Sequence, residues 1–384
     1  MSDRPAKVTF VISSFALGGA ERQLAALIAQ RPDSARRLDL EVVTFLQTSS
    51  PATASAFAES GVRHTLIDRT ALAFVPFFAR LIRHFRRTRP DVVHTVLDSS
   101  TGAWGRLAAW LAGVPVIVHS DRSLMTEGTR AHRLLRPFLD RITRHFFPNA
   151  EAIAERLVST GVPRDRITVV ANGVDLDRFR PSDEARRVAR TAWGLSDSAT
   201  VAGFLGRFVP VKRIDVLLDA VTSLPVASRP NHIVFVGDGP LMPDIRRRIE
   251  ADAWLRTACT LLGARDDVAE VLAGIDYLVL PSAIEGLPNA VLEAMAMAKP
   301  IVATRVSDVP FIVEGVGFLA PPNDVAGFAA ALAQMGGLSA AERRALGARA
   351  RARVEESYAL RTISNGFWQA HLDLLSKNGR RGTR

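Results

Sequence analysis

The sequence predicts an α/β protein of two tandem doubly wound domains. Short apolar runs of strand length alternate with helical stretches along nearly the whole chain, which is typical of parallel α/β layers. The alternation is interrupted once, by a polar passage over Asp177–Arg190 that we interpret as a linker, and 384 residues suffice for two domains. We expect residues 1–180 and 181–362 to form these domains, with a ligand cleft between them. Residues 363–384 should form a C-terminal helix that packs back on the first domain, and a tail.

Each expected strand is a short run rich in branched or aromatic apolar residues. In the first half, the expected strands are Val8–Ile12, Leu40–Phe45, Arg63–Leu66, Val92–Thr95, Val116–His119, Arg144–Pro148 and Ile167–Val170. In the second half, they are Thr200–Leu205, His232–Val236, Thr260–Leu262, Tyr277–Leu280 and Pro300–Thr304. Apolar residues at helical spacing predict helices between them, for example over Ala20–Gln30 and Ala103–Leu111, and the tail from Ala340 to Leu375 is also predicted to be helical.

The composition excludes several classes of protein. With 48% hydrophobic and 23% charged residues, the chain has the make-up of a globular enzyme and not of a disordered protein. A single cysteine, Cys259, excludes a disulfide framework or a thiolate metal site and fits a reducing compartment. No run reaches the roughly 18 apolar residues of a membrane span. The apolar run after Lys7 weakly mimics a signal peptide but is better explained as a first strand, so we expect a cytoplasmic protein.

The net charge of +10 is concentrated in the first half of the chain. Residues 1–190 carry 28 basic against 19 acidic residues, or +9, and the remainder carries 49−28 = 21 against 39−19 = 20, or +1. Amphipathic stretches at Phe74–Phe85 and Arg130–Phe146 place arginines around an apolar face. These stretches predict either surface helices with a solvated basic face or, at the cytoplasmic side, docking on an anionic membrane.

The segment Pro281–Pro300 gives the clearest indication of chemistry. A turn with Glu285 follows a buried strand, and Pro288 suits the start of a helix because its missing N–H is not needed there. The helix expected over Ala290–Ala298 is apolar on every side except at Glu293, so it should be buried. A buried carboxylate needs donors, which sugar or ribose hydroxyls or a distant arginine could supply. With phosphate-binding N–H groups at the helix start, we interpret the segment as a pocket for a nucleotide-linked sugar.

Further motifs accompany this segment in a fixed order. They are Gly18-Gly19-Ala20-Glu21-Arg22-Gln23-Leu24, Arg89-Pro-Asp-Val-Val-His94-Thr, Asn172-Gly-Val-Asp175, Gly206-Arg207-Phe-Val-Pro-Val-Lys212, Val236-Gly-Asp-Gly-Pro240 and Pro300-Ile-Val-Ala-Thr304. In this order, together with Glu285-x7-Glu293, they resemble the retaining family 4 glycosyltransferases of the group 1 type. The resemblance covers nearly the whole chain and implies the GT-B fold of two Rossmann-like domains.

The resemblance implies a set of site residues. The implied donor-binding residues are Gly18, Gly19, Arg207, Lys212, Arg265, Glu285, Gly286, Leu287 and Glu293. The implied catalytic residues are Glu285, His119, Arg207 and Lys212. The first glutamate of the pair would lie by the donor sugar, and the second would hold the ribose hydroxyls.

Physical arguments support parts of this set and leave structural alternatives open. Gly18 and Gly19 follow a strand and precede a helix, so their N–H groups could approach an anion, although they could also form a mere tight turn. Arg207 and Lys212 suit a diphosphate whose charge grows during reaction, although they could also be a solvated pair. His119 at a strand end is either structural or orienting toward the donor sugar; His94 is structural or on the acceptor side.

The resemblance also implies the reaction. A UDP- or GDP-linked sugar would pass, with retained configuration, to a glycolipid, lipid-linked saccharide or polysaccharide. No carboxylate nucleophile is evident beside His119, which favours same-face displacement with the leaving diphosphate accepting the proton. Because Arg207 and Lys212 can stabilise that diphosphate, we expect no metal and no other cofactor.

Three departures from the family pattern are evident, and other functions stay open. Ser307-Asp308 stands where a glycine pair is common, Phe311 where a glutamate is common, and Ala298 where a glycine is common. The turn at Val316-Gly317 is also shortened. The alternatives are a nucleotide-sugar epimerase of the same fold, a non-catalytic nucleotide-sugar binder, or a nucleic-acid-binding protein. The last would explain the basic half but not the apolar helix with Glu293, so we expect no nucleic-acid partner.

Overall fold

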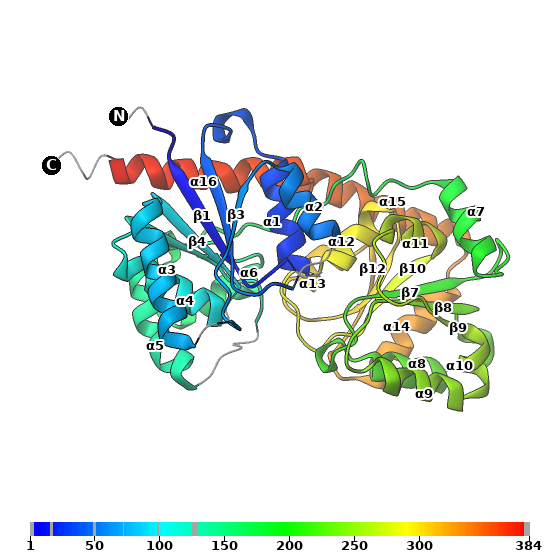
Figure 1. The fold of residues 1–384 in the computed structure, drawn as a ribbon. Helices are drawn as coiled ribbons and strands as arrows, with labels where there is room; N and C mark the ends of the chain where they lie inside the picture. Colours follow the sequence, from blue (N-terminus) through cyan, green and yellow to red (C-terminus); the bar gives the residue numbers. More distant parts are fainter. Residues whose placement is uncertain are drawn as a thin grey trace. The chain divides into compact units, whose positions relative to one another are not determined.

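The structure, a computed structural model, describes residues 4–15, 18–48, 51–71, 73–97, 100–124 and 130–379. It divides into two compact units, one of Met1–Gly173 with Leu360–Arg384 and one of Val174–Ala359 (Figure 1). Each unit contains a six-stranded parallel sheet flanked by helices, so the predicted α/β fold with two doubly wound units is confirmed.

The first unit is built on the strand order β3-β2-β1-β4-β5-β6. Its strands are β1 (Lys7–Ile12), β2 (Asp39–Thr44), β3 (Arg63–Leu66), β4 (Val92–Val96), β5 (Val116–Ser120) and β6 (His145–Phe146). Its helices are α1 (Gly19–Ala29), α2 (Pro51–Glu59), α3 (Phe74–Thr88), α4 (Ser100–Leu111), α5 (Arg130–Ile142), α6 (Glu151–Ser159) and α16 (Leu360–Gly379). The order reverses between β1 and β4, which makes their carboxyl ends the expected ligand position of this sheet.

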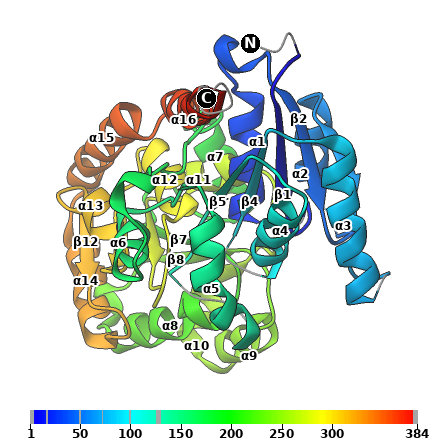
Figure 2. The same cartoon turned by 90° about the vertical axis from the view of Figure 1, so that its left-hand side faces the viewer.

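Two apolar layers cover the two faces of this sheet. Phe77, Leu81 and Phe85 of α3 pack with α4 on one face, against β-strand residues such as Val11 and Val93 (Figure 2). On the other face, Leu24 and Leu27 of α1 and Trp368 of α16 belong to a second buried cluster. They pack there with the strand residues that point to this face, among them Val8 and Phe10 of β1. The alternation of β1 between the two layers follows from the period-2 geometry of a strand.

The C-terminal helix α16 packs on the first unit, as predicted. Trp368 is fully buried, and its ring packs edge-on to that of Phe10, with 6.0 Å between the ring centroids. Its Nε1–H donates to the carbonyl of Leu27 (2.8 Å), and the Ser364 hydroxyl donates to the carbonyl of Gln30 (2.9 Å). These donors satisfy carbonyls at the end of α1, which have no partner within that helix.

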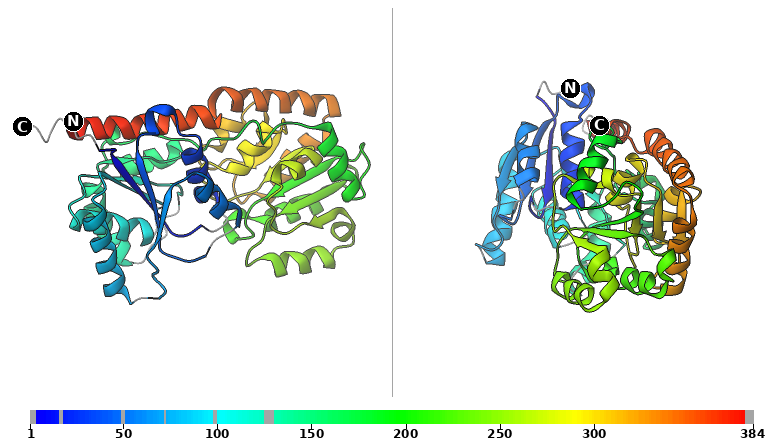
Figure 3. Two further views of the ribbon diagram at one scale, coloured as in Figure 1. Left: turned by 45° about the horizontal axis from the view of Figure 1, so that its top comes forward. Right: turned by 90° about the vertical axis from the view of Figure 1, so that its right-hand side faces the viewer.

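The second unit has the strand order β12-β11-β10-β7-β8-β9. It forms the green to orange part of the ribbon (Figure 3). Its strands are β7 (Val201–Leu205), β8 (His232–Val236), β9 (Cys259–Leu261), β10 (Tyr277–Leu280), β11 (Ile301–Thr304) and β12 (Gly317–Ala320). Its helices are α7 (Asp183–Ala192), α8 (Ile214–Ser223), α9 (Met242–Ala251), α10 (Ala253–Ala258), α11 (Val268–Gly274), α12 (Asn289–Ala296), α13 (Val309–Val313), α14 (Val325–Gly337) and α15 (Ala340–Ser357). Here the order reverses between β7 and β10.

Two local predictions are wrong, and one strand was not predicted. Ile167–Val170 is not a strand: Ile167 makes only an isolated bridge with Phe146, because β6 offers just two residues as a partner. The Asp177–Arg190 passage is not linker throughout, since Ser182 caps α7 by accepting from the Ala185 N–H (3.1 Å). The turn at Val316-Gly317 leads into an unpredicted strand, β12, where Gly317 lies so close to Ile301 that a Cβ would meet its carbonyl oxygen at 2.1 Å.

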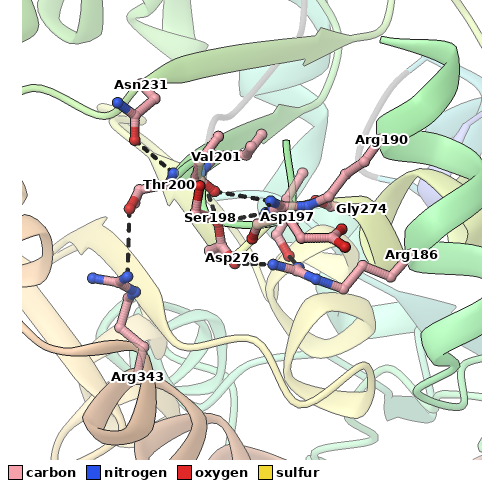
Figure 4. A network of polar contacts seen from close by, with 12 residues as sticks. Arg186, Arg190, Asp197, Ser198, Thr200, Val201, Asn231, Gly274, Asp276 and Arg343 are labelled. Carbon is pink, nitrogen blue, oxygen red and sulfur yellow. Dashed lines mark hydrogen bonds and ion pairs between the residues drawn. The ribbon is translucent and has the colours of Figure 1, made fainter. Parts of the chain in front are cut away.

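An ionic network ties the amino ends of β7 and β10 to α7 (Figure 4). Asp276 accepts from Arg186 and Arg190, each at 2.7 Å, and from the backbone N–H of Val201. Arg190 is 1% exposed and also donates to the carbonyl of Gly274 at the end of α11 (3.0 Å). Because a buried guanidinium must be fully hydrogen-bonded, this network fixes α7 on the sheet.

Glu41 supplies a pH-dependent part of the stability of the first unit. Burial by itself raises the pKa of this carboxyl, but a hydrogen bond and charge from His84, a hydrogen bond from Thr65 and the charge of Lys7 outweigh it and lower the pKa to about 2. The hydroxyl of Thr65 donates to Oε1 at 2.8 Å. Since the folded pKa lies below the ordinary value of 4.5, the stabilisation is present above pH 4.5 and is lost as the pH falls toward 2.

Glu41→Gln should therefore lower the free energy of unfolding by roughly 3 kcal/mol at pH 7. Urea unfolding of both proteins between pH 7 and pH 3 measures this, with Glu59→Gln on the exposed end of α2 as the control. The two stability curves should converge as the pH falls below 4.5; curves that stay parallel would contradict the assignment.

Candidate functional site

The predicted donor residues of the second unit follow two strands that flank the reversal of strand order. Arg207 and Lys212 follow β7, and Glu285 follows its neighbour β10. The two loops are joined, because the Ala283 N–H donates to the carbonyl of Val211 (2.8 Å). Carboxyl ends at such a reversal are where open α/β sheets bind ligands. The chain thus concentrates polar groups at the sheet edge where the topology predicts a ligand site.

Lys212 and Glu285 form an ion pair at this place. The Lys212 ammonium donates to Oε1 of Glu285 at 2.5 Å, and the two side chains are 17% and 10% exposed. An ammonium has three donors and a carboxylate has further acceptor positions, so each group retains capacity for a ligand. Arg207 is exposed on the same edge, and its guanidinium forms no hydrogen bond or ion pair within the described part of the chain. The result is one paired and one unpaired cation at the crevice.

The helix α12 is buried, as its sequence predicts. All six buried residues over Val291–Ala296 are apolar except Glu293, which is 8% exposed. Pro288 occupies the N-cap, one residue before its expected place, and Leu287 before it is buried. The helix begins shortly after the carboxyl end of β10, and a helix N-terminus is a place where N–H groups can bind an anion. Glu293 lies one turn farther along the same helix.

The end of α12 explains why glycine is common at position 298. The N–H of Ala298 donates to the carbonyl of Met295 and that of Lys299 to the carbonyl of Ala294, both at 2.9 Å, which together form a Schellman motif. Ala298 therefore adopts a left-handed conformation with φ of 54°. Ser307, the second such departure, has φ of 49°. Both positions hold side chains where glycine carries no conformational penalty.

Two glycines of the second unit let neighbouring loops approach each other. A Cβ at Gly237 would lie 1.9 Å from the carbonyl oxygen of Gly206, and one at Gly239 would lie 2.6 Å from that of Phe208. The Gly237–Gly239 turn thus supports the loop that carries Arg207. Arg265, another predicted donor residue, is exposed and pairs with Asp267, its Nε donating at 2.6 Å. The structure joins Arg265 to its own loop and not to the Lys212–Glu285 pair.

In the first unit, Gly18 and Gly19 lie at the start of α1, after β1. Gly18 is the N-cap in an extended conformation, and a Cβ there would lie 2.1 Å from Oε2 of Glu21. The Glu21 side chain folds back over the helix start and fills the space beside Gly18. The carboxylate of Glu21 also raises the pKa of Arg122, although burial is the larger effect and lowers that pKa to about 10. The predicted anion role of Gly18 and Gly19 stays a prediction.

His119 is buried at the end of β5 and is neutral. Its Nδ1 lies 2.8 Å from the Thr95 hydroxyl, and its Nε2 has no hydrogen-bond partner within the described residues. Burial, then the charge of Arg106, lowers the pKa of His119 well below its usual range. A neutral imidazole with a free ring nitrogen can exchange a hydrogen bond with a hydroxyl but cannot act as a cation.

His94 belongs to a buried relay that reaches α16. The Phe367 carbonyl can only accept, so Nδ1–H of His371 donates to it (2.9 Å) and Nε2 of His371 accepts from Nδ1–H of His94 (2.9 Å). Nε2 of His94 then accepts from the Ser120 hydroxyl (2.8 Å). Burial lowers the pKa of both histidines, to about 4 for His371. The structural interpretation of His94 accounts for these contacts.

Sequence reasoning assigned no role to three motif residues that the structure connects. The Gln23 amide donates to the carbonyl of Gly173 (2.8 Å) and accepts from its N–H (3.0 Å). Arg122 donates to Oδ1 of Asn172, next to that glycine. A Cβ at Gly173 would lie 2.8 Å from Cα of Leu360, so this residue is held from both sides. The only signal in the sequence was that Gln23, Asn172 and Gly173 lie in the quoted motifs.

No group of three or more histidine, cysteine or acidic side chains that could hold a metal ion occurs within the described ranges. One Asp-x-Asp sequence is present, at Asp175-Leu-Asp177. Asp175 accepts from the backbone N–H groups of Asp177 (3.0 Å) and Arg178 (3.1 Å), so it caps a turn. The expected independence of a metal stays a prediction.

The basic amphipathic stretches form α3 and α5. In α3, Phe77, Leu81 and Phe85 are buried, while Phe74 is 47% and Val75 is 74% exposed. With Trp110 and Leu111 on α4, and Leu134 and Phe138 on α5, six of the ten exposed large apolar side chains in the described part of the chain lie on these helices. Asp140 is the single acidic residue of the three helices, and it pairs with Arg106. We call the surface formed by these six apolar side chains and the exposed arginines of α3 the aromatic–arginine face; the arginines are Arg80, Arg83, Arg86 and Arg87.

No helix among the described residues combines the length and the apolar character needed to cross a bilayer.

Comparison with known proteins gives consistent results. Residues 199–336 match the family described as Glycosyl transferases group 1, and residues 17–178 match Glycosyltransferase Family 4. The chain is 31% identical, over 72% of its length and 78% of the relative's, to the Escherichia coli UDP-Gal:alpha-D-GlcNAc-diphosphoundecaprenol alpha-1,3-galactosyltransferase. It is 30% identical, over 63% of its length and 68% of the relative's, to the alpha-D-kanosaminyltransferase of Streptomyces kanamyceticus.

Solved structures share the fold. The Anabaena protein HepE, in complex with UDP and glucose, superposes with a TM-score of 0.81 over 96% of this chain and 100% of that one, at 19% identity.

Ala298→Gly should raise the free energy of unfolding by about 1 kcal/mol, because glycine removes the left-handed penalty at the end of α12. Denaturant unfolding measures the change. Ala296→Gly, two residues earlier in helical conformation, is the matched control and should lower the stability by about 1 kcal/mol or more. A loss of stability in both variants would contradict the role of φ at position 298.

Proposed function

The chain belongs to the group 1, family 4 glycosyltransferases, and from this membership we propose a retaining transfer of a sugar from a nucleoside diphosphate to a lipid-linked saccharide, glycolipid or polysaccharide. The observation that carries the proposal is the Lys212–Glu285 ion pair at the reversal of strand order, beside the start of α12. The base is expected to be uracil or guanine.

In the proposed donor site, each part of the nucleotide sugar is bound by a different small set of residues. Glu293, buried on α12, would accept from the ribose hydroxyls, and Arg265 would lie toward the base. Arg207 and Lys212 would hold the diphosphate, and the N–H groups of Gly18 and Gly19 in the first unit stay a separate prediction for an anion. Glu285 would meet the sugar, next to the backbone of Gly286 and Leu287. Charge-assisted hydrogen bonds of this kind are the strong ones in recognition of phosphate.

Catalysis would rest on positioning and on charge stabilisation. As the bond from sugar to diphosphate breaks, negative charge grows on the leaving oxygen, where Arg207 and Lys212 would stabilise it. The leaving diphosphate would take the proton of the acceptor hydroxyl, which attacks from the same face of the sugar. Asp121, the carboxylate nearest His119 in sequence, is bound by Arg156 and so is poorly suited to be a nucleophile. His119 of the first unit would act as a neutral hydrogen-bonding partner of the substrate, and catalysis would need no metal.

The acceptor is proposed from the relatives and from the surface of the first unit. The Escherichia coli relative is named for a diphosphoundecaprenol-linked acceptor. A lipid-linked acceptor would bring the enzyme to the cytoplasmic face of the membrane as a peripheral protein. The aromatic–arginine face fits anionic lipid, because α3, α4 and α5 have no exposed acidic residue among the described side chains. Each cation at the surface adds about 1 kcal/mol to the binding of an anionic membrane.

Lys212→Ala and Glu285→Gln should each lower the rate of sugar transfer at least a hundredfold, while the melting temperature changes little. The donor is first identified by thermal shift with UDP- and GDP-sugars, since ligand at about 100 times its Kd adds about 2.7 kcal/mol. Transfer to lipid extract is then measured with and without EDTA, and the two rates should agree. Arg247→Ala, an exposed arginine on α9, is the control.

Full turnover by either variant would refute the site assignment. Conversion of the donor without acceptor would favour the epimerase alternative, and tight donor binding without any turnover would favour a non-catalytic binder. Binding of duplex or single-stranded nucleic acid, without a response to nucleotide sugars, would favour the remaining class.

Membrane docking has a separate test. The double variant Val75→Ser with Leu134→Ser should weaken co-sedimentation with vesicles containing anionic lipid roughly tenfold. The matched control is Val188→Ser with Val226→Ser, two exposed valines of the second unit at 60% and 67%, against 74% for Val75 and 82% for Leu134. Binding by the native chain should fall with added salt. Binding that is weak and indifferent to salt, or equal loss in both double variants, would exclude this surface.

A further inference from the structure

We propose that Arg351 is a positioning residue, which sets Glu293 by fixing the carboxyl end of α12 from the neighbouring helix α15. The inference rests on the proposed function in one respect, that the ligand of Glu293 is the ribose of a nucleoside diphosphate. Its structural part, the fixing of α12, stands on contacts within the second unit.

The carbonyl groups at the end of α12 show where Arg351 acts. The last turn of a helix leaves carbonyls without a partner inside the helix. Those of Glu293, Ala294 and Met295 accept from the backbone N–H groups of residues 297, 299 and 298, respectively. The carbonyl of Ala296 accepts from Nη1 of Arg351. Arg351 therefore completes the cap that the chain's own backbone begins.

The helix α15 is pressed against this end of α12. The two helices are neighbours in the second unit (Figure 1). A Cβ at Gly347 would lie 1.9 Å from the carbonyl oxygen of Ala298, so glycine is required there for the approach. One helical turn later, Arg351 also donates to the carbonyl of Phe179 (3.0 Å), and its Nε pairs with Glu355 at 2.7 Å. The guanidinium is thus held on both sides and joins α12 to the Phe179 segment.

The contact is close enough to Glu293 to matter. Ala296 is three residues beyond Glu293, and the Glu293 carbonyl itself accepts from Met297. With only eight residues, α12 is about 12 Å long, so a movement at its end moves the Glu293 side chain and the N–H groups at its start. Small displacements of a binding group cost large factors in affinity and rate.

The same helix supplies a matched control. Arg353 also uses Nη1 to donate to two carbonyls, those of Ile312 (2.9 Å) and Glu314 (2.8 Å). These carbonyls end α13, which carries no proposed site residue. Arg353→Gln removes the same kind of cap from the same helix and should cost similar stability.

The experiment compares Arg351→Gln, Arg351→Lys and Arg353→Gln. Hydrogen exchange of the free protein should speed up over residues 289–298 in Arg351→Gln alone, and over residues 309–316 in Arg353→Gln alone. The Kd of UDP or GDP, whichever the native chain binds, should rise roughly tenfold in Arg351→Gln. Arg351→Lys, which keeps one donor for Ala296, should restore part of that affinity. Arg353→Gln should keep the native Kd at a similar fall in melting temperature.

The outcomes separate this proposal from the proposed function. Unchanged exchange over residues 289–298 in Arg351→Gln would overturn it, and so would equal losses of nucleotide affinity in both glutamine variants. If the native chain bound no nucleoside diphosphate, the proposed function would fail, and the exchange measurement would still decide whether Arg351 fixes α12. Normal binding without sugar transfer would count against the reaction alone and leave the positioning role supported.

Discussion

A carboxylate carried by a buried apolar helix is the constraint on which the site depends. Glu293 is 8% exposed on α12, and the other buried residues of that helix are apolar. Such a helix must lie against the sheet, and such a carboxylate must be hydrogen-bonded. Both requirements place polar chemistry at the carboxyl edge of β10, which adjoins β7 where the strand order reverses. The Lys212–Glu285 pair lies at this same edge and gives the crevice its charge.

The arrangement of arginines explains how the second unit keeps this edge in place. Arginines of α15 donate to carbonyls at the ends of other helices: Arg343 to Leu338, Arg349 to Gly315, and Arg351 to Ala296. Lys299 does the same at the end of α11, donating to the carbonyl of Ile275 (2.8 Å), and burial lowers its pKa to about 7. These caps lie at the amino edge of the sheet, away from the proposed ligand. Part of the high arginine content is therefore structural, and charge counts alone overstate the surface available to an anionic partner.

Much of the fold was predictable because each strand is a local apolar run. Arg63–Leu66, His232–Val236 and Tyr277–Leu280 end where the sequence places them. Ile167–Val170 has the same composition but lacks a partner of sufficient length, and β12 is short and begins with a glycine, so pairing decided both cases. The α7 helix depends on the Ser182 cap within a polar passage that periodicity alone assigns to a linker.

The site was predictable only where the local sequence of one segment determines the environment of the residue. The burial of Glu293 follows from the helix that carries it, whereas the 2.5 Å contact of Lys212 with Glu285 joins residues 73 positions apart and depends on the sheet order. The clamp of Gln23 on Gly173 and the contact of Arg351 with Ala296 are equally non-local. The left-handed backbone at Ala298 shows the reverse case, in which the structure explains a residue that the sequence marks as unusual.

The most direct measurement is a crystal structure of the chain with a nucleoside diphosphate. The account predicts ribose hydroxyls within hydrogen-bond distance of the Glu293 carboxylate and a diphosphate beside Arg207 and Lys212. A nucleotide bound elsewhere, with Glu293 held by a protein cation and remote from the ligand, would contradict it.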